Sequence, residues 1–428
     1  MLPIIKSDDT ESIDKRLLNR AQTDYAQQQK TVDEILYDIK TNGDKALFDY
    51  IQKFDGFAVT SQNLLVSKQE IQEAFLEVDK ALIEIMKEAA QNIKEFHDRQ
   101  KRENWFIEKD GKILGQLYIP VQSAGVYVPG GKAAYPSSVL MNIIPAKCAG
   151  VKNICVATPA TNGQINPVTI VAASIAGADR IYKMGGAQAI AAFAYGTQSV
   201  PKTNKVTGPG NIYVALAKKS VYGQVGIDMI AGPSEVLVIA DEDANEQFIA
   251  ADFLSQAEHD ELAACVLVTN SEQMAGKVKA EILKQMQQLP KKEIVLKSLE
   301  NYGTIILAKD LQDCVDISNR IAPEHLEICT KNPMELLPKV INAGSIFLGE
   351  YSPEPLGDYF AGTNHVLPTN STSKFSSPLN VDDFQKKSSV IYYSKEEFEK
   401  VYKKVEMFAE AEGLDAHARS AKIRFEEL

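Results

Sequence analysis

The sequence lacks several features that would place it in large functional classes. It contains five cysteines with no Cys-x-x-Cys pair among them, so neither a disulfide framework nor a thiolate zinc site is indicated. No apolar run approaches the ~20 residues of a membrane span, and Met1 to Asp9 contain no signal-peptide core. We therefore expect a cytoplasmic protein with reduced thiols.

Positive charge is also in short supply. Lys and Arg number 46 against 57 Asp and Glu, which gives a net charge of −11 over 428 residues. Because phosphate backbones are bound by clustered Lys and Arg, we expect no nucleic-acid partner. A hydrophobic content of 45% is typical of a globular protein, and the length predicts more than one domain.

The order of apolar and polar residues predicts an α/β fold. Residues 1–104 are polar with helical periodicity, and strands then alternate with amphipathic helices. In a first set, strands are expected at 113–121, 125–128, 153–157, 180–184 and 205–207, and helices at 137–149, 167–176, 187–195 and 212–221. In a second set, strands are expected at 235–240, 263–269 and 303–307, and helices at 245–259, 271–288 and 310–321. Such alternation predicts βαβ units and parallel sheets in two lobes.

The C-terminal part of the sequence has a different composition. Residues 349–390 are rich in Ser, Pro, Gly and Asn, and we expect long functional loops there. An amphipathic helix is expected at 396–411, followed by a short tail that contains a histidine.

Histidine is scarce, with five residues in all, yet three of them lie beside carboxylates. These three are found in Gln256-Ala257-Glu258-His259-Asp260, in Pro323-Glu324-His325 and in Glu412-Gly413-Leu414-Asp415-Ala416-His417. Imidazole titrates near neutral pH and is the commonest metal ligand, so the pattern indicates a metal site, an acid–base pair or both. His97 is expected on a solvent-exposed helix surface.

Gln256 and His259 are three residues apart near the end of a predicted helix, so both project from one face. This spacing suits two ligands of one metal ion, and zinc readily accepts imidazole nitrogen. Glutamine is an uncommon ligand, however, and the alternative is a protonated His259 favoured by the helix dipole.

Glu324 and His325 are adjacent, so they point in different directions and do not easily share a metal ion. Because Pro323 ends the preceding helix, both are expected at the start of a new segment, at an exposed mouth. They are candidate general bases, or Glu324 serves the first turn of a helix.

Three further residues each have a structural and a functional interpretation. Asp358 is either a turn residue of a Pro/Gly loop or a ligand. His365 either stabilises its loop or lines a pocket. His417, which follows Gly413, is a candidate helix C-cap.

The sequence has no Gly-x-Gly-x-x-Gly dinucleotide motif after a strand. Two other segments, Gly208-Pro209-Gly210-Asn211 and Pro129-Gly130-Gly131, allow close backbone approach at strand ends, where parallel sheets bind ligands. The residues alone thus predict an α/β enzyme with a metal ion and an acid–imidazole pair.

Taken together, the motifs resemble those of histidinol dehydrogenases. They occur in the family's order from about residue 105 to the C-terminus. The matching segments are Gly125-Val126-Tyr127-Val128-Pro129-Gly130-Gly131, Gly185-Gly186-Ala187-Gln188-Ala189-Ile190-Ala191, Gly208-Pro209-Gly210-Asn211, Ala231-Gly232-Pro233-Ser234-Glu235, Leu254-Ser255-Gln256-Ala257-Glu258-His259-Asp260, Ala322-Pro323-Glu324-His325-Leu326-Glu327, Gly357-Asp358-Tyr359, Ala361-Gly362-Thr363-Asn364-His365-Val366-Leu367-Pro368-Thr369 and Gly413-Leu414-Asp415-Ala416-His417.

The resemblance implies a zinc enzyme that oxidises L-histidinol to L-histidine with two NAD⁺, the last step of histidine biosynthesis. The residues that match the family's zinc ligands are Gln256, His259, Asp358 and His417. Glu324 and His325 match the proton-transfer pair. Cofactor contacts are expected from Tyr127, Gln188 and Asn211. Substrate contacts are expected from Ser234, Glu412, the proton-transfer pair and the four ligand residues.

The family's fold has two related, incomplete Rossmann-like lobes, in an intertwined homodimer whose tail completes the partner's active site. The resemblance therefore implies a helical N-terminal segment at 1–110 that packs partly on the second lobe. The first lobe is expected at 111–234, the second lobe with the metal and catalytic loops at 235–380, and the C-terminal helical tail at 381–428. Two alternatives are a zinc hydrolase, in which Glu324 activates water, and a non-catalytic metal- or nucleotide-binding protein of the same fold.

Overall fold

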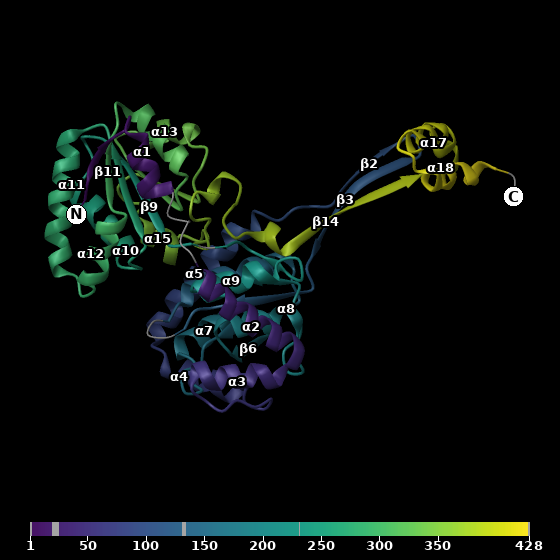
Figure 1. The fold of residues 1–428 in the computed structure, drawn as a ribbon, viewed down its shortest axis with the longest axis horizontal. Helices are drawn as coiled ribbons and strands as arrows, with labels where there is room; N and C mark the ends of the chain where they lie inside the picture. The colour runs from purple at the N-terminus through teal and green to yellow at the C-terminus, as the bar shows by residue number, and fades with distance from the viewer. Residues whose placement is uncertain (1, 19–24, 131–133, 231, 427–428) are drawn as a thin grey trace. The chain divides into compact units, whose positions relative to one another are not determined.

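The computed structural model describes residues 2–18, 25–130, 134–230 and 232–426 (Figure 1). Gly131 and Ala231, which belong to two of the motifs, lie outside the described residues. The chain divides into two compact units. Unit 1 comprises Met1–Gln100 and Val121–Phe384, and unit 2 comprises Lys101–Pro120 and Gln385–Leu428.

Unit 1 contains a first sheet of five parallel strands with helices on both faces. The strand order is β6 (Arg180–Lys183), β5 (Asn153–Thr158), β4 (Ser123–Tyr127), β7 (Lys205–Thr207) and β8 (Gly226–Ile227). One face packs against α4 (Lys68–Glu77), α5 (Lys80–Asp98), α6 (Pro136–Ala149) and α7 (Pro167–Ala176). The other packs against α2 (Ala26–Asn42), α3 (Asp44–Asp55), α8 (Gly186–Tyr195) and α9 (Ile212–Val221).

Unit 1 also contains a second, six-stranded parallel sheet. Its order is β1 (Ile4–Lys6), β11 (Thr304–Leu307), β10 (Ala264–Thr269), β9 (Glu235–Ala240), β12 (His325–Cys329) and β13 (Ser345–Leu348). One face is covered by α10 (Glu246–Ala257), α11 (Glu272–Gln285) and α12 (Lys292–Asn301). The other face is covered by α1 (Thr10–Ile13), the π-helical turn η1 (Asp14–Leu18) and α13 (Leu311–Ile321).

The alternation of side chains along β12 determines what faces α10. Cys329 packs in the same core cluster as α10, whereas Leu326 and Ile328 pack in the cluster on the opposite face. Since successive strand residues point to opposite faces, His325 and Glu327 share the α10 face with Cys329. Two polar residues are thereby directed toward a buried helix.

Unit 2 is an antiparallel sheet with a helical end. Its strand order is β14 (Gln385–Tyr393), β3 (Lys112–Pro120) and β2 (Trp105–Lys109). Asp110 and Gly111 join β2 to β3 with φ of 51° and 74°, the positive angles that a tight Asp-Gly hairpin turn requires. The helices α16 (Lys395–Glu399), α17 (Tyr402–Ala411) and α18 (Asp415–Lys422) follow β14.

The predicted α/β class with two Rossmann-like lobes is confirmed, and most predicted strands and helices occur within two residues of their expected bounds. All five cysteines are free thiols. No helix in the described ranges has the length and apolar character needed to cross a membrane. The predicted helix at 396–411 is in fact two helices, because α16 ends at Glu399 and α17 begins at Tyr402.

The expectation for His97 was wrong. It lies on α5, as predicted, but is fully buried. Its Nδ1–H donates to the carbonyl oxygen of Ile93 at 2.8 Å, and its Nε2 lies 3.4 Å from the side-chain nitrogen of Asn364. Burial lowers its pKa. His97 is therefore a core residue that supports the loop containing His365.

A buried ion pair fixes the loop after β7. The side chains of Lys218 and Asp228 form this pair and are almost fully buried. Lys218 Nζ donates to the carbonyl oxygen of Gly208 at 2.9 Å, and Asp228 Oδ2 accepts from the Gly208 amide at 2.8 Å. Gly208 has a φ of 115°, and a Cβ there would lie 1.9 Å from the Tyr127 carbonyl oxygen. The close approach of β4 and this loop thus requires glycine.

Replacing Lys218 by Met is predicted to lower the free energy of unfolding by about 3–5 kcal/mol, because Asp228 would remain buried without its counter-charge. Denaturant unfolding followed by circular dichroism measures this loss. Lys219→Met, at an exposed position of the same helix, is the control and should change stability by less than about 0.5 kcal/mol. Equal stability of the two variants would contradict the prediction.

Candidate active site

Four predicted site residues converge at the amino end of the second sheet. His325 begins β12, Glu324 precedes it, Gln256 lies near the end of α10, and Asp358 lies in α15 (Glu354–Tyr359). His325 Nε2 is 3.5 Å from Asp358 Oδ1, and its Nδ1 is 3.4 Å from Gln256 Nε2 and 3.7 Å from Glu324 Oε2. The imidazole of His325 is therefore the centre of the cluster.

The backbone of Glu235, the first residue of β9, orients the acid and the imidazole. Its amide donates to Glu324 Oε2 at 2.8 Å, and its carbonyl oxygen accepts from His325 Nδ1–H at 3.0 Å. With Nδ1 held in this way, Nε2 is directed toward Asp358. One peptide segment thus fixes two titratable side chains.

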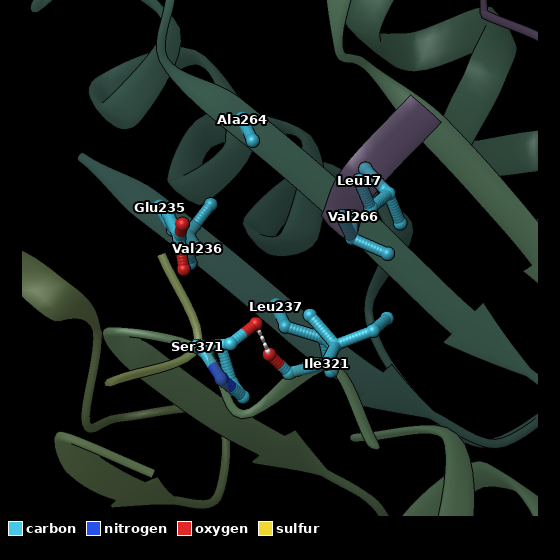
Figure 2. Close-up of a pocket in the computed structure, with 9 residues that line it drawn as sticks. Leu17, Glu235, Val236, Leu237, Ala264, Val266, Ile321 and Ser371 are labelled. Carbon is cyan, nitrogen blue, oxygen red and sulfur yellow. Dashed lines mark hydrogen bonds between the residues drawn. The ribbon is translucent and has the colours of Figure 1, made fainter. Parts of the chain in front are cut away.

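The turn that delivers Glu324 is tied to a distant loop. Ala322 adopts the left-handed conformation at the end of α13, with φ of 54°. Figure 2 shows Ser371 donating to the carbonyl oxygen of Ile321, at 2.6 Å, and Ser373 donates to that of Ala322 at 2.9 Å. These two hydroxyls bind the last carbonyls of the helix immediately before Pro323.

Figure 2 also shows a small cavity between the same turn and the strands β9 and β10, bordered by Leu17, Leu237 and Ile321. Its volume is about 10 Å³, which admits no more than about one water molecule. No substrate larger than water can bind there. The cavity lies beside Glu235 and contributes at most to the packing under the site.

Burial and charge shift the pKa values of the cluster. Burial raises the pKa of Glu324 to about 8, although neighbouring His325 opposes the shift. Burial alone would lower the pKa of His325, but the carboxylates of Glu324, Glu354 and Asp358 hold it well above its ordinary value. Burial would raise the pKa of Asp358, but the imidazole of His325 and other nearby imidazoles lower it. An anionic Asp358 therefore faces a polarised imidazole.

The expectation that Glu324 and His325 lie at an exposed mouth was wrong. Their exposed fractions are 6% and 3%, because β12 is an interior strand between β9 and β13. Asp358 is also not a loop residue, since it lies within the short helix α15. A buried acid–imidazole pair is less solvated than the predicted one, and its protonation states are correspondingly more sensitive to neighbouring charges.

The donor atoms fit a divalent cation. Gln256 is fully buried, and its Oε1 accepts no hydrogen bond from the described residues. His325 Nε2 is also buried and has no hydrogen-bond partner among the described residues. His259 is exposed just beyond the end of α10. Desolvation by the surrounding protein lowers its pKa, and the carboxylate of Asp358 opposes this shift. Unprotonated imidazole nitrogen, amide oxygen and carboxylate oxygen are ligands that zinc accepts.

A second residue set at this place is a rival for the cation. Ligand atoms of His325, Glu354 and Asp358 lie within 4.8 Å of one another. This set shares only Asp358 with the four predicted ligands. Glu354 has no counterpart among the residues that sequence reasoning selected.

The predicted cofactor residues lie at the other lobe, at the carboxyl ends of its strands. Tyr127 ends β4, and its hydroxyl accepts from the Gly186 amide at 3.2 Å. Burial raises its pKa to about 12, so it remains a neutral hydroxyl. Gln188 is buried in the first turn of α8, and Asn211 is the exposed N-cap of α9, accepting from the amides of Tyr213 and Val214. The three residues thus border one edge of the first sheet.

The remaining predicted residues are distributed between the two units. Ser234 lies half-buried just before β9, and its carbonyl oxygen accepts from the Ala264 amide at 3.0 Å. Glu412 and His417 belong to unit 2, and both are exposed there. His417 is the third residue of α18, so the alternative of a helix C-cap was wrong; Gly413, with φ of 72°, separates the two helices instead.

Comparison with known proteins gives a consistent result. The family model described as histidinol dehydrogenase matches residues 18–425. A histidinol dehydrogenase of Clostridium acetobutylicum is 54% identical over 398 residues, covering 92% of each protein. That of Bacillus subtilis is 54% identical over 400 residues, covering 93% of each. A crystal structure of histidinol dehydrogenase from Elizabethkingia anophelis superposes with a TM-score of 0.93 and 39% identity, covering 99% of this chain and 97% of that one.

The chain belongs to the histidinol dehydrogenase family.

Sequence reasoning missed three carboxyl residues next to the cluster. Glu354, Glu327 and Asp252 lie one turn or one strand repeat from Asp358, His325 and Gln256, respectively. Burial raises the pKa of Asp252 to about 6 and that of Glu354 to about 7, and it raises the pKa of Glu327 well above its ordinary value. Each of these carboxyl residues is one helical turn or one strand repeat from a predicted site residue, and this spacing in the sequence could have identified them.

Replacing Glu324 by Gln is predicted to change how stability depends on pH. Between its ordinary pKa of 4.5 and about 8, this carboxyl is ionised in the unfolded chain but protonated in the folded one. The folded state then binds more protons, so raising the pH destabilises it. The variant lacks this loss, and its stability relative to the unchanged protein should rise from pH 5 to pH 8, by at most about 1.4 kcal/mol per pH unit.

The measurement is thermal unfolding of chelator-treated protein across this pH range. Glu84→Gln, which removes an exposed carboxylate from α5, should show a difference that does not vary with pH. A Glu324→Gln difference that is flat, or that falls with rising pH, would show that the native carboxyl is ionised throughout.

Proposed function

We propose that this chain oxidises L-histidinol to L-histidine through the aldehyde, with two NAD⁺ as electron acceptors and one bound zinc ion. The family assignment supports the reaction. The observation that carries the proposal is the meeting of Gln256, Glu324, His325 and Asp358 in one buried cluster, since these residues come from three separate stretches of sequence. Two of them, Gln256 and His325, leave a buried polar atom without a hydrogen-bond donor or acceptor.

In this proposal Gln256, His259 and Asp358 hold the zinc ion together with His417 of a second copy of the chain. When bound, the zinc ion would orient the substrate's nitrogen donors and stabilise nearby negative charge. Its ligand set contains no thiolate, in keeping with the burial of four of the five cysteines in the cores. The substrate would lie between this site and Ser234, with Glu412 of the second copy as a further contact.

Proton transfer falls to His325 and Glu324. A cation bound nearby would lower the pKa of both groups and favour their unprotonated forms. His325 is held through Nδ1 by the Glu235 carbonyl, so its unprotonated Nε2 is the atom that accepts the alcohol proton as the carbon is oxidised. Glu324, held by the Glu235 amide, accepts in its ionised form a proton from the water that hydrates the aldehyde. Both side chains are oriented by the backbone of Glu235. His325 can therefore serve the first oxidation and Glu324 the second while both stay in place.

NAD⁺ would accept two electrons in each oxidation. Tyr127, Gln188 and Asn211 would bind it at the carboxyl ends of the strands of the first sheet, where parallel sheets bind ligands. Tyr127 offers a neutral hydroxyl already fixed by the Gly186 amide. The absence of a complete glycine fingerprint fits a cofactor that exchanges during the reaction while the aldehyde stays bound.

The proposed active unit is a homodimer in which the tail of each chain completes the partner's site. Unit 2 carries several apolar side chains that are each exposed over more than half their surface, namely Phe106, Ile107, Ile391, Met407 and Phe408. Exposed apolar side chains gathered in one small unit favour a protein interface there.

We also propose the functional boundaries 1–110, 111–234, 235–380 and 381–428, which the family resemblance implies.

The proposed reaction fixes a stoichiometry. Complete conversion of a limiting amount of L-histidinol should yield two NADH per molecule, measured by absorbance with the product quantified by chromatography. Treatment with a chelator should abolish turnover, and zinc should restore it. A ratio of one NADH per histidinol, or full activity of metal-free protein, would contradict the proposal.

A shared site also predicts complementation between inactive variants. Gln256→Ala and His417→Ala should each be inactive alone, because each lacks one ligand in both sites of its dimer. After the two are unfolded together and refolded, random pairing gives roughly half mixed dimers with one intact site each, so about a quarter of the unchanged activity should return. Mixing Gln256→Ala with Asp358→Ala is the control, because both changes fall on the same chain's contribution and no intact site forms.

A further inference from the structure

Three carboxyl groups lie directly behind the cluster, and each comes from an element that also supplies a cluster residue. On α10, Asp252 is four residues before Gln256; on α15, Glu354 is four residues before Asp358. Residues four apart on a helix are neighbours on one face. On β12, Glu327 is two residues after His325, on the same face of the strand. We call Asp252, Glu327 and Glu354 the carboxyl tier.

Short-range interactions join the carboxyl tier across all three elements. The Glu354 amide donates to Glu327 Oε1 at 2.8 Å, which ties the start of α15 to β12. The side chains of Glu327 and Asp252 are close enough for the charge of each to affect the other, which couples β12 to α10. Glu327 therefore occupies the centre, with one contact to each of the other two elements.

Two of the three residues of the carboxyl tier are as buried as the core around them. The exposed fractions of Glu327 and Glu354 are 1% and 2%, and Asp252 is half-buried. No N–H or O–H group of the described residues donates to Oε2 of Glu327 or of Glu354.

An apolar residue in place of Glu327 would have a smaller free-energy penalty for burial, because a buried carboxyl group must be neutralised or paired. The buried residues of α10 other than Gln256 are apolar, and Cys329 on the same side of β12 packs with them. A carboxyl here contributes little to packing that leucine would not. Its contacts instead set the spacing between α10, β12 and α15, the three elements that present Gln256, His325 and Asp358.

We propose that the carboxyl tier is a positioning device for the cation site, with Glu327 as its central residue, and that it holds Gln256 and Asp358 at the separation that the bound cation requires, with His325 beside them as the base. This inference rests on the proposed function. Groups that orient metal ligands from behind typically contribute 10–100-fold to metal affinity.

The test compares zinc affinity and steady-state kinetics of Glu327→Leu, Glu327→Gln and the unchanged protein. Zinc affinity is measured on the metal-free full-length protein by competition with a chromophoric chelator, so it does not depend on turnover. Glu327→Leu should bind zinc about 10–100-fold more weakly and lose kcat more than KM rises. Glu327→Gln keeps an oxygen for the Glu354 amide and supplies an N–H to Asp252, so its affinity should stay within about threefold of the unchanged protein.

Two further variants keep the test decisive. Asp252→Ala, at the half-buried end of the carboxyl tier, should weaken zinc binding about tenfold and serves if Glu327→Leu does not fold. Ser298→Ala removes a buried hydrogen bond in the same lobe, from Ser298 Oγ to the Ala263 carbonyl oxygen at 3.0 Å, and should leave zinc affinity unchanged.

The outcomes separate this inference from the proposed function. Unchanged zinc affinity in folded Glu327→Leu or Asp252→Ala overturns the inference alone, as does an equal loss in Glu327→Gln and Glu327→Leu. Failure of the unchanged protein to bind zinc or to oxidise histidinol overturns the proposed function and, with it, the inference.

Discussion

The structure depends on the burial of polar side chains at the amino end of the second sheet. Gln256 and His325 are almost entirely removed from water, and Gln256 Oε1 and His325 Nε2 find no hydrogen-bond partner among the described residues. Leaving a buried polar atom unpaired costs about 1–3 kcal/mol. A fold that maintains Gln256 Oε1 in this state beside the anionic Asp358 is organised for a positively charged ligand, and His325 Nε2 remains available to exchange a proton.

That burial follows from where the cluster lies in the sheet. β12 is an interior strand, and its pairing with β9 and β13 leaves only its side-chain faces available. The face that carries His325 and Glu327 is covered by α10, so the polar residues of strand and helix meet without solvent between them. The backbone of Glu235 supplies the two hydrogen bonds that fix Glu324 and His325. In the first sheet the predicted cofactor residues lie at the carboxyl ends of the strands, because Tyr127 ends β4 and Asn211 follows β7. The cluster of the second sheet lies instead at the amino ends of its strands.

The sequence predicted the features that depend on local pattern. Short apolar runs that alternate with amphipathic helices predicted both parallel sheets, since buried parallel strands such as β9 are almost continuously apolar. The separation of Gln256 and His259 predicted a shared helix face, and this prediction was wrong, because α10 ends at Ala257 and leaves His259 exposed beyond it while Gln256 is buried. The pattern could not predict the environment of a residue whose neighbours are distant in sequence. The sequence around His97 has the periodicity of a charged, exposed helix surface, but Asn364, which is 267 residues away in the sequence, packs against it. The expectation that Glu324 and His325 lie at an exposed mouth was wrong for the same reason, because only the strand order shows that β12 is an interior strand.

The carboxyl tier illustrates the same limit. Each of its residues is an ordinary acid in its own segment, and only the packing of α10, β12 and α15 places the three together. Likewise, the sequence resemblance implied one ligand set, namely Gln256, His259, Asp358 and His417, and only the structure shows a second set around Asp358. Both Gln256 with His259 and His325 with Glu354 lie on elements that reach it, and the choice between them decides whether His325 is a ligand or a base.

Anomalous diffraction at the zinc absorption edge, from crystals of the zinc-loaded dimer, tests this choice most directly. We predict one peak per chain at bonding distance, about 2.0–2.2 Å, from Gln256, His259 and Asp358, with a His417 imidazole as the fourth protein ligand and His325 unbound. A peak bonded to His325 and Glu354, or one distant from Gln256, would contradict it.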